Sequence, residues 1–232
     1  MSVMFNILAP VMLITAIGYI LGRMSIGLQS RTLGNLVILV ATPSLVFHTN
    51  VTADIGKESL SDLLMAAALC LTISGLIAFM ALKLAGSSPQ SYLPSLMFPN
   101  SGNLGLPLVV LAFGTLGTQM GISYFVVVAL IQHSLGLAIA SGGFRIGELA
   151  RQPLVYSVAL VLLVMVTGME VPQVILTTTK MLGDMMIPAM LILLGISLAT
   201  LKVTDLKVAA ALAVARLVIG LISAIAVIKL LD

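Results

Sequence analysis

The stretch Phe98-Pro99-Asn100-Ser101-Gly102-Asn103-Leu104-Gly105-Leu106-Pro107 lies inside an apolar segment, and it cannot form a regular helix. It holds two prolines, two glycines and two asparagines within ten residues. Each proline removes an amide donor and clashes with the preceding turn, and each glycine costs roughly 1 kcal/mol of helix stability relative to alanine. Broken backbone at membrane depth is tolerated only where it lines a cavity or is buried in protein. The stretch is therefore the first candidate for a functional site.

The composition around this stretch is that of an integral membrane protein. Of the 232 residues, 60% are hydrophobic and 8% are charged, and the mean hydropathy is +1.21. A soluble domain carries roughly a quarter charged residues, so lipid is the solvent that this surface fits. The net charge of +3 does not indicate nucleic-acid binding, because the basic residues are scattered between apolar runs and form no stripe.

Apolar runs of spanning length predict an all-α protein with about eight transmembrane helices. The expected helices cover residues 3–22, 32–49, 62–84, 92–114, 119–141, 153–169, 181–200 and 208–230. The longest break between them is 50–61, which leaves no room for a second, soluble domain.

The basic residues predict the orientation of these helices, because cytoplasmic loops carry an excess of lysine and arginine. Seven of them follow the odd-numbered helices: Arg23, Arg31, Lys83, Arg145, Arg151, Lys202 and Lys207. Three lie on the opposite side: Lys57, Lys180 and Lys229. The odd-numbered loops are then cytoplasmic, and the N-terminus is outside.

Two further helices contain a central proline, Pro43 in the second and Pro188 in the seventh. Each proline is followed by a short apolar run, and the two helices are five apart. An odd repeat length inverts the second copy in the membrane, and paired broken helices are a feature of secondary transporters.

These motifs resemble the auxin efflux carrier family, which includes the plant PIN-type carriers and bacterial organic-anion permeases. Residues 99–107 look like the family's crossover segment, with Pro-Asn-Ser followed by Gly-Leu-Pro. Residues 39–48 are similar to the family's second helix, and 183–199 to its seventh. The resemblance runs along the whole chain, with three motifs in order.

The resemblance implies a fold of ten helices in two inverted five-helix repeats. We therefore expect a first repeat at 1–142, with the broken fourth helix, and a partial second repeat at 143–232. Because the sequence stops at Asp232, after the eighth helix, we expect a truncated chain rather than a shortened member. The short connection at 142–152 favours a prokaryotic-type permease of the bacterial inner membrane and argues against auxin as the substrate.

The candidate site residues follow from the resemblance and from the chemistry of the crossover. The resemblance implies that Asn100 faces the substrate, and its side-chain amide offers two donors to a carboxylate, although Asn100 could instead only cap the broken helix. Ser101 and Asn103 could add donors, and Gln132 falls where PIN-type carriers have a substrate-facing glutamine. The remaining positions, expected to shape the backbone, are Pro99, Gly102, Gly105, Pro107, Pro43 and Pro188.

Three ionisable residues have open roles. His133 could carry a proton or bond a neighbouring carbonyl. Asp184 could be a cation or proton site, or an acid at the start of the seventh helix. Arg216, roughly 13 Å into the eighth helix, could balance an anionic substrate, extend its charge to the interface or pair within the two helices that are missing.

The leading hypothesis is a secondary carrier for small organic anions, chiefly carboxylates, that works by alternating access at the broken helix. The crossover would move against a scaffold of helices 1, 2, 6 and 7. The alternative is a truncated, non-transporting membrane scaffold or pseudo-carrier. An intramembrane hydrolase is rejected because no nucleophile and base are paired. We expect no cofactor and no metal site, leave the coupling ion open between H⁺ and Na⁺, and note that carriers of this architecture often form homodimers.

Overall fold

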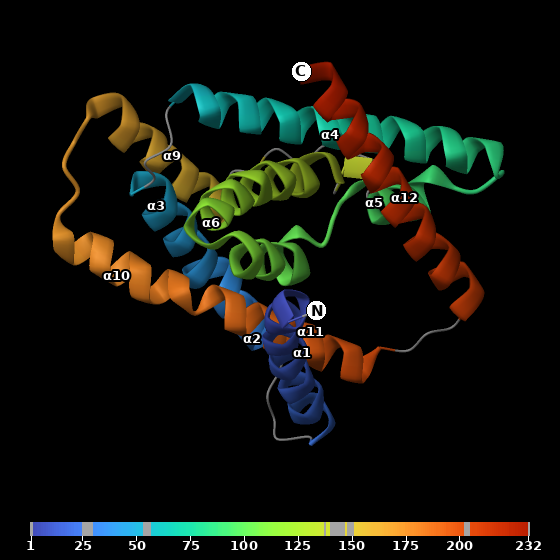
Figure 1. The fold of residues 1–232 in the computed structure, drawn as a ribbon, viewed down its shortest axis with the longest axis horizontal. Coiled ribbons are helices and arrows are strands. Elements are labelled where there is room, and N and C mark those ends of the chain that lie inside the picture. Colours follow the sequence, from blue (N-terminus) through green and yellow to red (C-terminus); the bar gives the residue numbers. More distant parts are fainter. Residues whose placement is uncertain are drawn as a thin grey trace. The chain divides into compact units, whose positions relative to one another are not determined.

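Helices make up almost all of the chain that the structure, a computed structural model, describes (Figure 1). The described residues are 2–24, 30–52, 57–136, 138–139, 147, 151–201 and 205–231. Arg145 and Lys202, which were used to predict the orientation, lie outside them. Within these ranges the chain contains no strand, in agreement with the all-α prediction.

Most helices lie where the apolar runs predicted them. The regular ones are α1 (Ser2–Arg23), α4 (Lys57–Leu84), α9 (Pro153–Thr167) and α12 (Leu206–Leu231). The second predicted helix is α2 (Ser30–Leu36), a π-helical turn η1 (Val37–Ala41) and α3 (Thr42–Val51) in one run. The interrupted regions consist of α5 (Pro89–Met97), η2 (Ser101–Gly105), α6 (Leu106–Ile131), η3 (Gln132–Gly136), α10 (Gln173–Asp184) and α11 (Met186–Thr200).

Six helical stretches among the described residues are long and apolar enough to cross a membrane, and α9 is a shorter apolar helix. Together these are seven stretches where eight were predicted. The difference arises because Pro89–Gly136 forms one stretch, which covers the two predicted helices 92–114 and 119–141. The chain is therefore a multi-pass, all-helical membrane protein.

Inside α6 the chain turns back at Gly114, which separates these two predicted helices. Gly114 has φ 59° and ψ −137°, a conformation that residues with a Cβ rarely adopt. A Cβ on Gly121 would lie 3.1 Å from Leu106 Cδ1 and 3.3 Å from Val109 Cγ1. In a straight helix, residues 106 and 121 would be about 22 Å apart along the axis. The segments before and after Gly114 therefore pack against each other (Figure 1).

The helices divide into two compact units, each built from segments far apart in sequence. The first unit comprises Met1–Asp54, Asn100–Phe125 and Arg151–Lys202, and the second comprises Ile55–Pro99, Val126–Ala150 and Val203–Asp232. Helices 1, 2, 6 and 7, the predicted scaffold, all belong to the first unit. The predicted repeats, 1–142 and 143–232, are two consecutive segments of sequence, unlike these units, and they remain a prediction.

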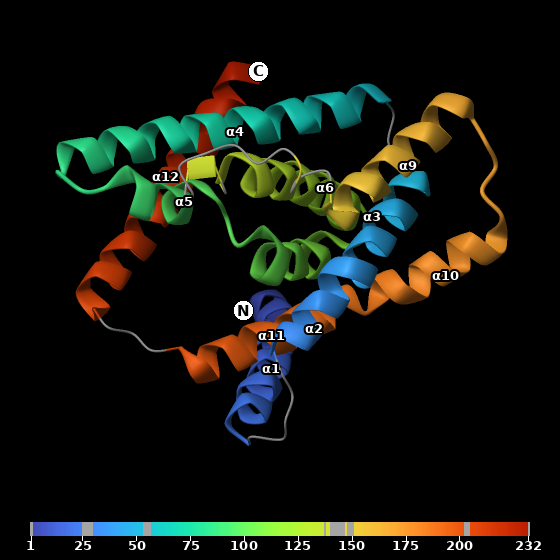
Figure 2. The ribbon, with the colours of Figure 1, turned by 180° about the vertical axis from the view of Figure 1, so that it is seen from behind.

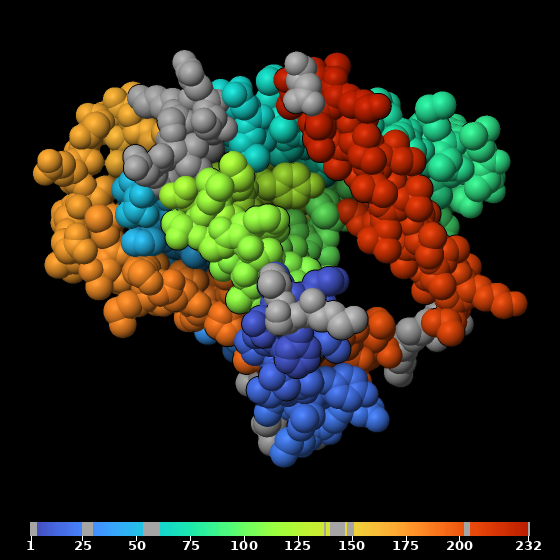
Figure 3. All heavy atoms as spheres, viewed as in Figure 1, coloured from blue at the N-terminus to red at the C-terminus, as the bar shows by residue number. Residues whose placement is uncertain are grey.

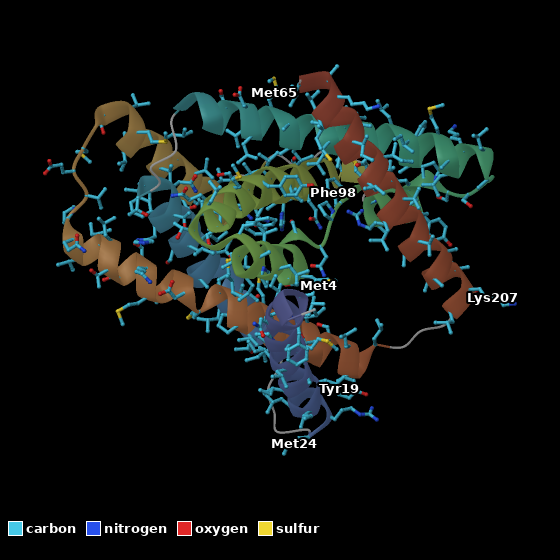
Figure 4. The ribbon with its side chains drawn as sticks, in the orientation of Figure 1. Met4, Tyr19, Met24, Met65, Phe98 and Lys207 are labelled. Carbon is cyan, nitrogen blue, oxygen red and sulfur yellow. The ribbon has the colours of Figure 1, made fainter. Side chains whose placement is uncertain are left out.

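Small residues hold α1 against α11 in the first unit. A Cβ on Gly18 would lie 2.2 Å from the carbonyl oxygen of Ile192, and one on Gly195 would lie 2.1 Å from that of Thr15. Glycine lets two helix backbones approach this closely, as is common in membranes. The outer side of α1 stays at the surface, where Met4 and Tyr19 are 70% and 42% exposed (Figure 4).

The same unit contains a second packed group, α3 with α9 and α10 (Figure 2). Gly183 of α10 lies against the backbone of Leu45 in α3, where an added Cβ would be 2.8 Å from Leu45 Cα. The seventh predicted helix is thus anchored on the second at the level of their proline-bearing segments.

In the second unit, α12 packs on α4 and α5 with one face. That face is formed by Ile219, Ser223 and Val227, which are all buried. The hydroxyl of Ser74 in α4 donates to that of Ser223 across 2.9 Å. The other faces of α12 are apolar and exposed, with Leu217 at 75% (Figure 3), as expected of a helix in contact with lipid.

Candidate substrate site at the interrupted helices

The interruption predicted at residues 98–107 is present in the structure. Helix α5 ends at Met97, and Phe98 is extended with φ −91° and ψ 125°. Asn100 has φ −75° and ψ 60°, and the π-turn η2 follows directly and leads into α6. Phe98 lies in the second unit against Gly136, where an added Cβ would be 2.8 Å from its ring (Figure 4).

A wide turn precedes a proline at two of the three interrupted positions. Before Pro107, the Gly105 amide donates to the Asn100 carbonyl at 3.0 Å, five residues back, and the Leu106 amide donates to the Ser101 carbonyl. Before Pro43, the Thr42 amide donates to the Val37 carbonyl in the same way. Because proline cannot donate and clashes with the preceding turn, each helix widens one turn earlier.

The third proline interrupts the seventh helix differently and corrects its predicted start. Residues 181–200 were expected, but the helical run begins at Gln173, is interrupted at Met185 and resumes as α11. Pro188 has no amide for the Asp184 carbonyl four residues back. Asp184 accordingly ends α10 and does not begin the seventh helix. Its carboxylate pairs with Lys180 Nζ at 2.6 Å, with both side chains more than half exposed.

Asn100 has an exposed side chain at the start of η2, and its main chain and side chain act separately. The carbonyl accepts from Gly105, while the side-chain amide makes no capping hydrogen bond to the turn. The side-chain cap considered from the sequence is therefore absent in this conformation. The first amides of a helix have no partner within it, and here they follow Asn100 directly in sequence.

The other polar residues of the stretch differ in burial. Ser101 is buried and Asn103 is half-buried. Gly102 lies against two apolar side chains, since a Cβ there would be 3.0 Å from both Met190 Cε and Phe125 Cε2. A Cβ on Gly105 would lie 3.4 Å from the Asn100 carbonyl oxygen. Gly102 thus packs tightly against two side chains, whereas the distance at Gly105 is that of an ordinary van der Waals contact.

Met190 and Phe125 were not singled out from the sequence. Met190 is in α11, two residues after Pro188, and Phe125 is in the part of α6 that follows Gly114. Their side chains pack against Gly102 in the interrupted stretch. The sequence offers little signal for this contact, because an apolar residue within an apolar helix looks like the residues around it. The spacing of Met190 from Pro188 is the one feature that marks it.

Gln132 and His133 begin the π-turn η3 in the second unit, and both are exposed. His133 Nδ1 lies 2.7 Å from the carbonyl oxygen of Ala129, one turn earlier. This is the local carbonyl bond that the sequence left as one of two alternatives for His133. Gln132 is its neighbour in sequence, and adjacent residues of a helix do not face the same way.

Arg216 of α12 contacts the last turn of α5, also within the second unit. Its Nη1 donates to the carbonyl of Leu96 at 2.6 Å and to that of Ser95 at 3.2 Å. Sequence reasoning missed this contact. A signal was present, because Pro99 has no amide to donate to the carbonyl of Ser95, four residues earlier.

The structure thus groups the predicted residues in two sets. Asn100, Ser101, Asn103 and Pro107 lie in the first unit, with the helices that contain Pro43, Pro188 and Asp184. Pro99, Gln132, His133 and Arg216 belong to the second unit. Among the described residues, no group of three His, Cys, Asp or Glu side chains is arranged to hold a metal ion.

Comparison with known proteins identifies the family. A profile described as a membrane transport protein matches residues 3–141 and 138–232. A curated relative from Methanothermobacter thermautotrophicus, described as an uncharacterized transporter, is 32% identical over 143 residues, 57% of this chain and 47% of the relative. The chain spans about half the length of that relative.

The fold and its interrupted helices define a multi-pass membrane protein with discontinuous spans. The chain belongs to the membrane transport protein family, the auxin efflux carrier family that the motifs resemble. This is a family of transporters and not of enzymes, in agreement with the rejection of a hydrolase.

Proposed function

We propose that the protein is a secondary carrier for small organic anions, chiefly carboxylates, and that Asn100 binds the carboxylate. The observation that carries the proposal is the side-chain amide of Asn100, which makes no capping bond and is exposed at the start of a helix. Helix amino ends favour anions because their first amides and the helix dipole point at the ligand. Asn103 and Ser101 would supply further donors, and the substrate-facing role of Gln132 remains an expectation from the family resemblance.

Alternating access is the mechanism proposed from the discontinuous helices, with the crossover residues Asn100–Pro107 in the same compact unit as the predicted scaffold. Helices 1, 2, 6 and 7 belong to one compact unit, and the chain passes from the other unit into it at Pro99–Asn100. Movement of the crossover relative to that scaffold would carry the substrate from one face of the membrane to the other, as in other carriers with discontinuous helices. Uniport or proton-assisted transport fits better than a sodium site, because acidic side chains are scarce in the apolar segments.

The proposed location is the bacterial inner membrane with the N-terminus outside, and a homodimer is the proposed assembly. The alternative function is a non-transporting scaffold or pseudo-carrier. The transport assay below decides between the two.

The test is uptake of radiolabelled lactate, malonate, succinate and malate by proteoliposomes that contain the purified chain. We expect saturable uptake of at least one, and a loss of about tenfold or more in Asn100→Ala, since a hydrogen bond to a charged group contributes about 1.5–3 kcal/mol. Asn100→Asp places a negative charge at the site and should abolish uptake. Asn6→Ala, an exposed asparagine of α1, is the matched control. No uptake of any of the four would favour the scaffold.

A further inference from the structure

Arg216 lies on the packed face of α12, although it is a charged residue within a membrane-spanning helix. It stands about 15 Å from the start of α12 at 1.5 Å per residue. Ile219, Ser223 and Val227 follow it at helical spacing on the same face, and all three are buried. A charge placed inside a membrane helix on its protein-facing side requires specific partners.

The last turn of α5 supplies carbonyls that have lost their helical donors. In a continuous helix the Ser95 carbonyl would accept from the amide of residue 99, but Pro99 has none. The Leu96 carbonyl would accept from residue 100, but the helix ends at Met97 and Phe98 is extended. A carbonyl without a partner at membrane depth costs several kcal/mol.

Arg216 Nη1 donates to these same two carbonyls, at 2.6 Å for Leu96 and 3.2 Å for Ser95. The guanidinium also places a positive charge at the carboxyl end of a helix, where the helix dipole is negative. Pro99 thus removes a donor from the end of α5, and Arg216 supplies one.

We propose that Arg216 is a positioning residue, which caps the carboxyl end of α5 and holds the crossover in its interrupted form. Its effect on transport rests on the proposed function, but its effect on α5 does not. The role differs from that of a counter-charge for the substrate, because here the guanidinium charge is directed at backbone carbonyls.

The cap is tested without a substrate by hydrogen–deuterium exchange of the purified protein. In Arg216→Gln we expect the amides of α5 and Phe98 to exchange about tenfold faster or more, the scale of a lost bond to a charged group. Arg216→Lys keeps a charged donor, so its exchange rate in α5 should fall between those of the wild type and Arg216→Gln. Ser223→Ala, which removes a polar contact of the same α12 face to α4, is the control and should leave α5 at the wild-type rate. Equal acceleration in Ser223→Ala and Arg216→Gln would overturn the proposal.

A second substitution makes the test specific to the lost donor. Pro99→Ala restores an amide at residue 99 that can pair with the Ser95 carbonyl. Arg216→Gln should therefore accelerate exchange less in the Pro99→Ala background than alone, a coupling that a double-mutant cycle measures. Strict additivity of the two substitutions would contradict a shared role at the end of α5.

The transport assay separates positioning from substrate binding. Arg216→Gln should lower the maximal uptake rate, with KM changed by less than about twofold and by the same factor for lactate and malate. A counter-charge would instead raise KM, and more for the dicarboxylate malate, which would overturn the proposal. If the wild-type protein takes up no carboxylate, the proposed function fails while the exchange experiment still decides the cap.

Discussion

Asn100 illustrates how the main chain and the side chain of one residue can serve different ends. Its carbonyl closes the π-turn with Gly105, so the turn forms without help from the side chain. Asparagine is a common capping residue, and a capping bond would have been accepted by Oδ1 from a backbone amide and would have fixed the side chain against the turn. Because that bond is absent, the side chain is not held against the turn, and in the proposed site its Nδ2 group donates to the ligand.

The ion pair of Asp184 with Lys180 predicts a minor role for the carboxylate. Asp184→Asn should change stability by less than about 1 kcal/mol, as is usual for exposed pairs, and should leave the rate and pH dependence of uptake unchanged. Lys180→Gln is the control for the other half of the pair. A lost pH dependence in Asp184→Asn alone would instead identify Asp184 as the proton carrier.

The stability of the contact between α1 and α11 should depend on the missing side chain of Gly195. Its missing Cβ would lie 2.1 Å from the Thr15 carbonyl oxygen and 2.5 Å from the Tyr19 nitrogen. Both atoms belong to backbone and cannot move aside, so Gly195→Ala should force the helices apart and lower the thermal unfolding midpoint. Gly220→Ala in α12 has no atom within 4 Å and should raise stability by about 0.5–1 kcal/mol. Equal midpoints for the two variants would contradict this packing.

Among the helices, the second and fourth predicted ones share one construction. Each has a π-turn that is closed by the amide of the residue before a proline, at Thr42–Pro43 and at Leu106–Pro107. The seventh helix differs, because α10 ends at Asp184, four residues before Pro188. There the proline leaves the Asp184 carbonyl without a helical donor, and a break at Met185 takes the place of a π-turn.

The π-turn before Pro107 predicts a trade between stability and transport. Pro107→Ala restores an amide, so the turn can close as a regular α-helix, and the unfolding midpoint should stay level or rise. Uptake should fall about tenfold or more, because the amides that follow Asn100 would be redirected. The control is Pro10→Ala in α1, a helix whose proline is not preceded by such a turn. Unchanged uptake in Pro107→Ala would show that the wide turn is dispensable.

For the molecule as a whole, the distribution of basic residues predicts the topology. Cys70 is the only cysteine, so Cys70→Ala gives a background for labelling with a membrane-impermeant maleimide in intact cells. Glu170→Cys, in the loop after α9, should react from outside, and Ala85→Cys, in the loop after α4, should react only after the cells are opened. Both residues are exposed. The opposite pattern would place the N-terminus in the cytoplasm.

Much of the helical layout was predictable, because a lipid-facing helix is marked by a long apolar run. The carboxyl ends of α1, α4 and α12 at their apolar limits and the interruption at Pro99–Pro107 follow from such local signals. The start of α10 at Gln173 was missed, since its polar residues ended the apolar run early while the backbone remained helical.

Local sequence was sufficient for the membrane class, the approximate helices and the places where they break, because hydropathy and proline chemistry act over a few neighbouring residues. The contacts made across the chain required the folded structure: Arg216 with the carbonyls of α5, and Gly102 with Met190 and Phe125. The physical reason is that a carbonyl without a helical donor can accept from any nearby donor, and a glycine can be packed against by any nearby side chain. Its partner is chosen by helix packing between residues that are distant in sequence.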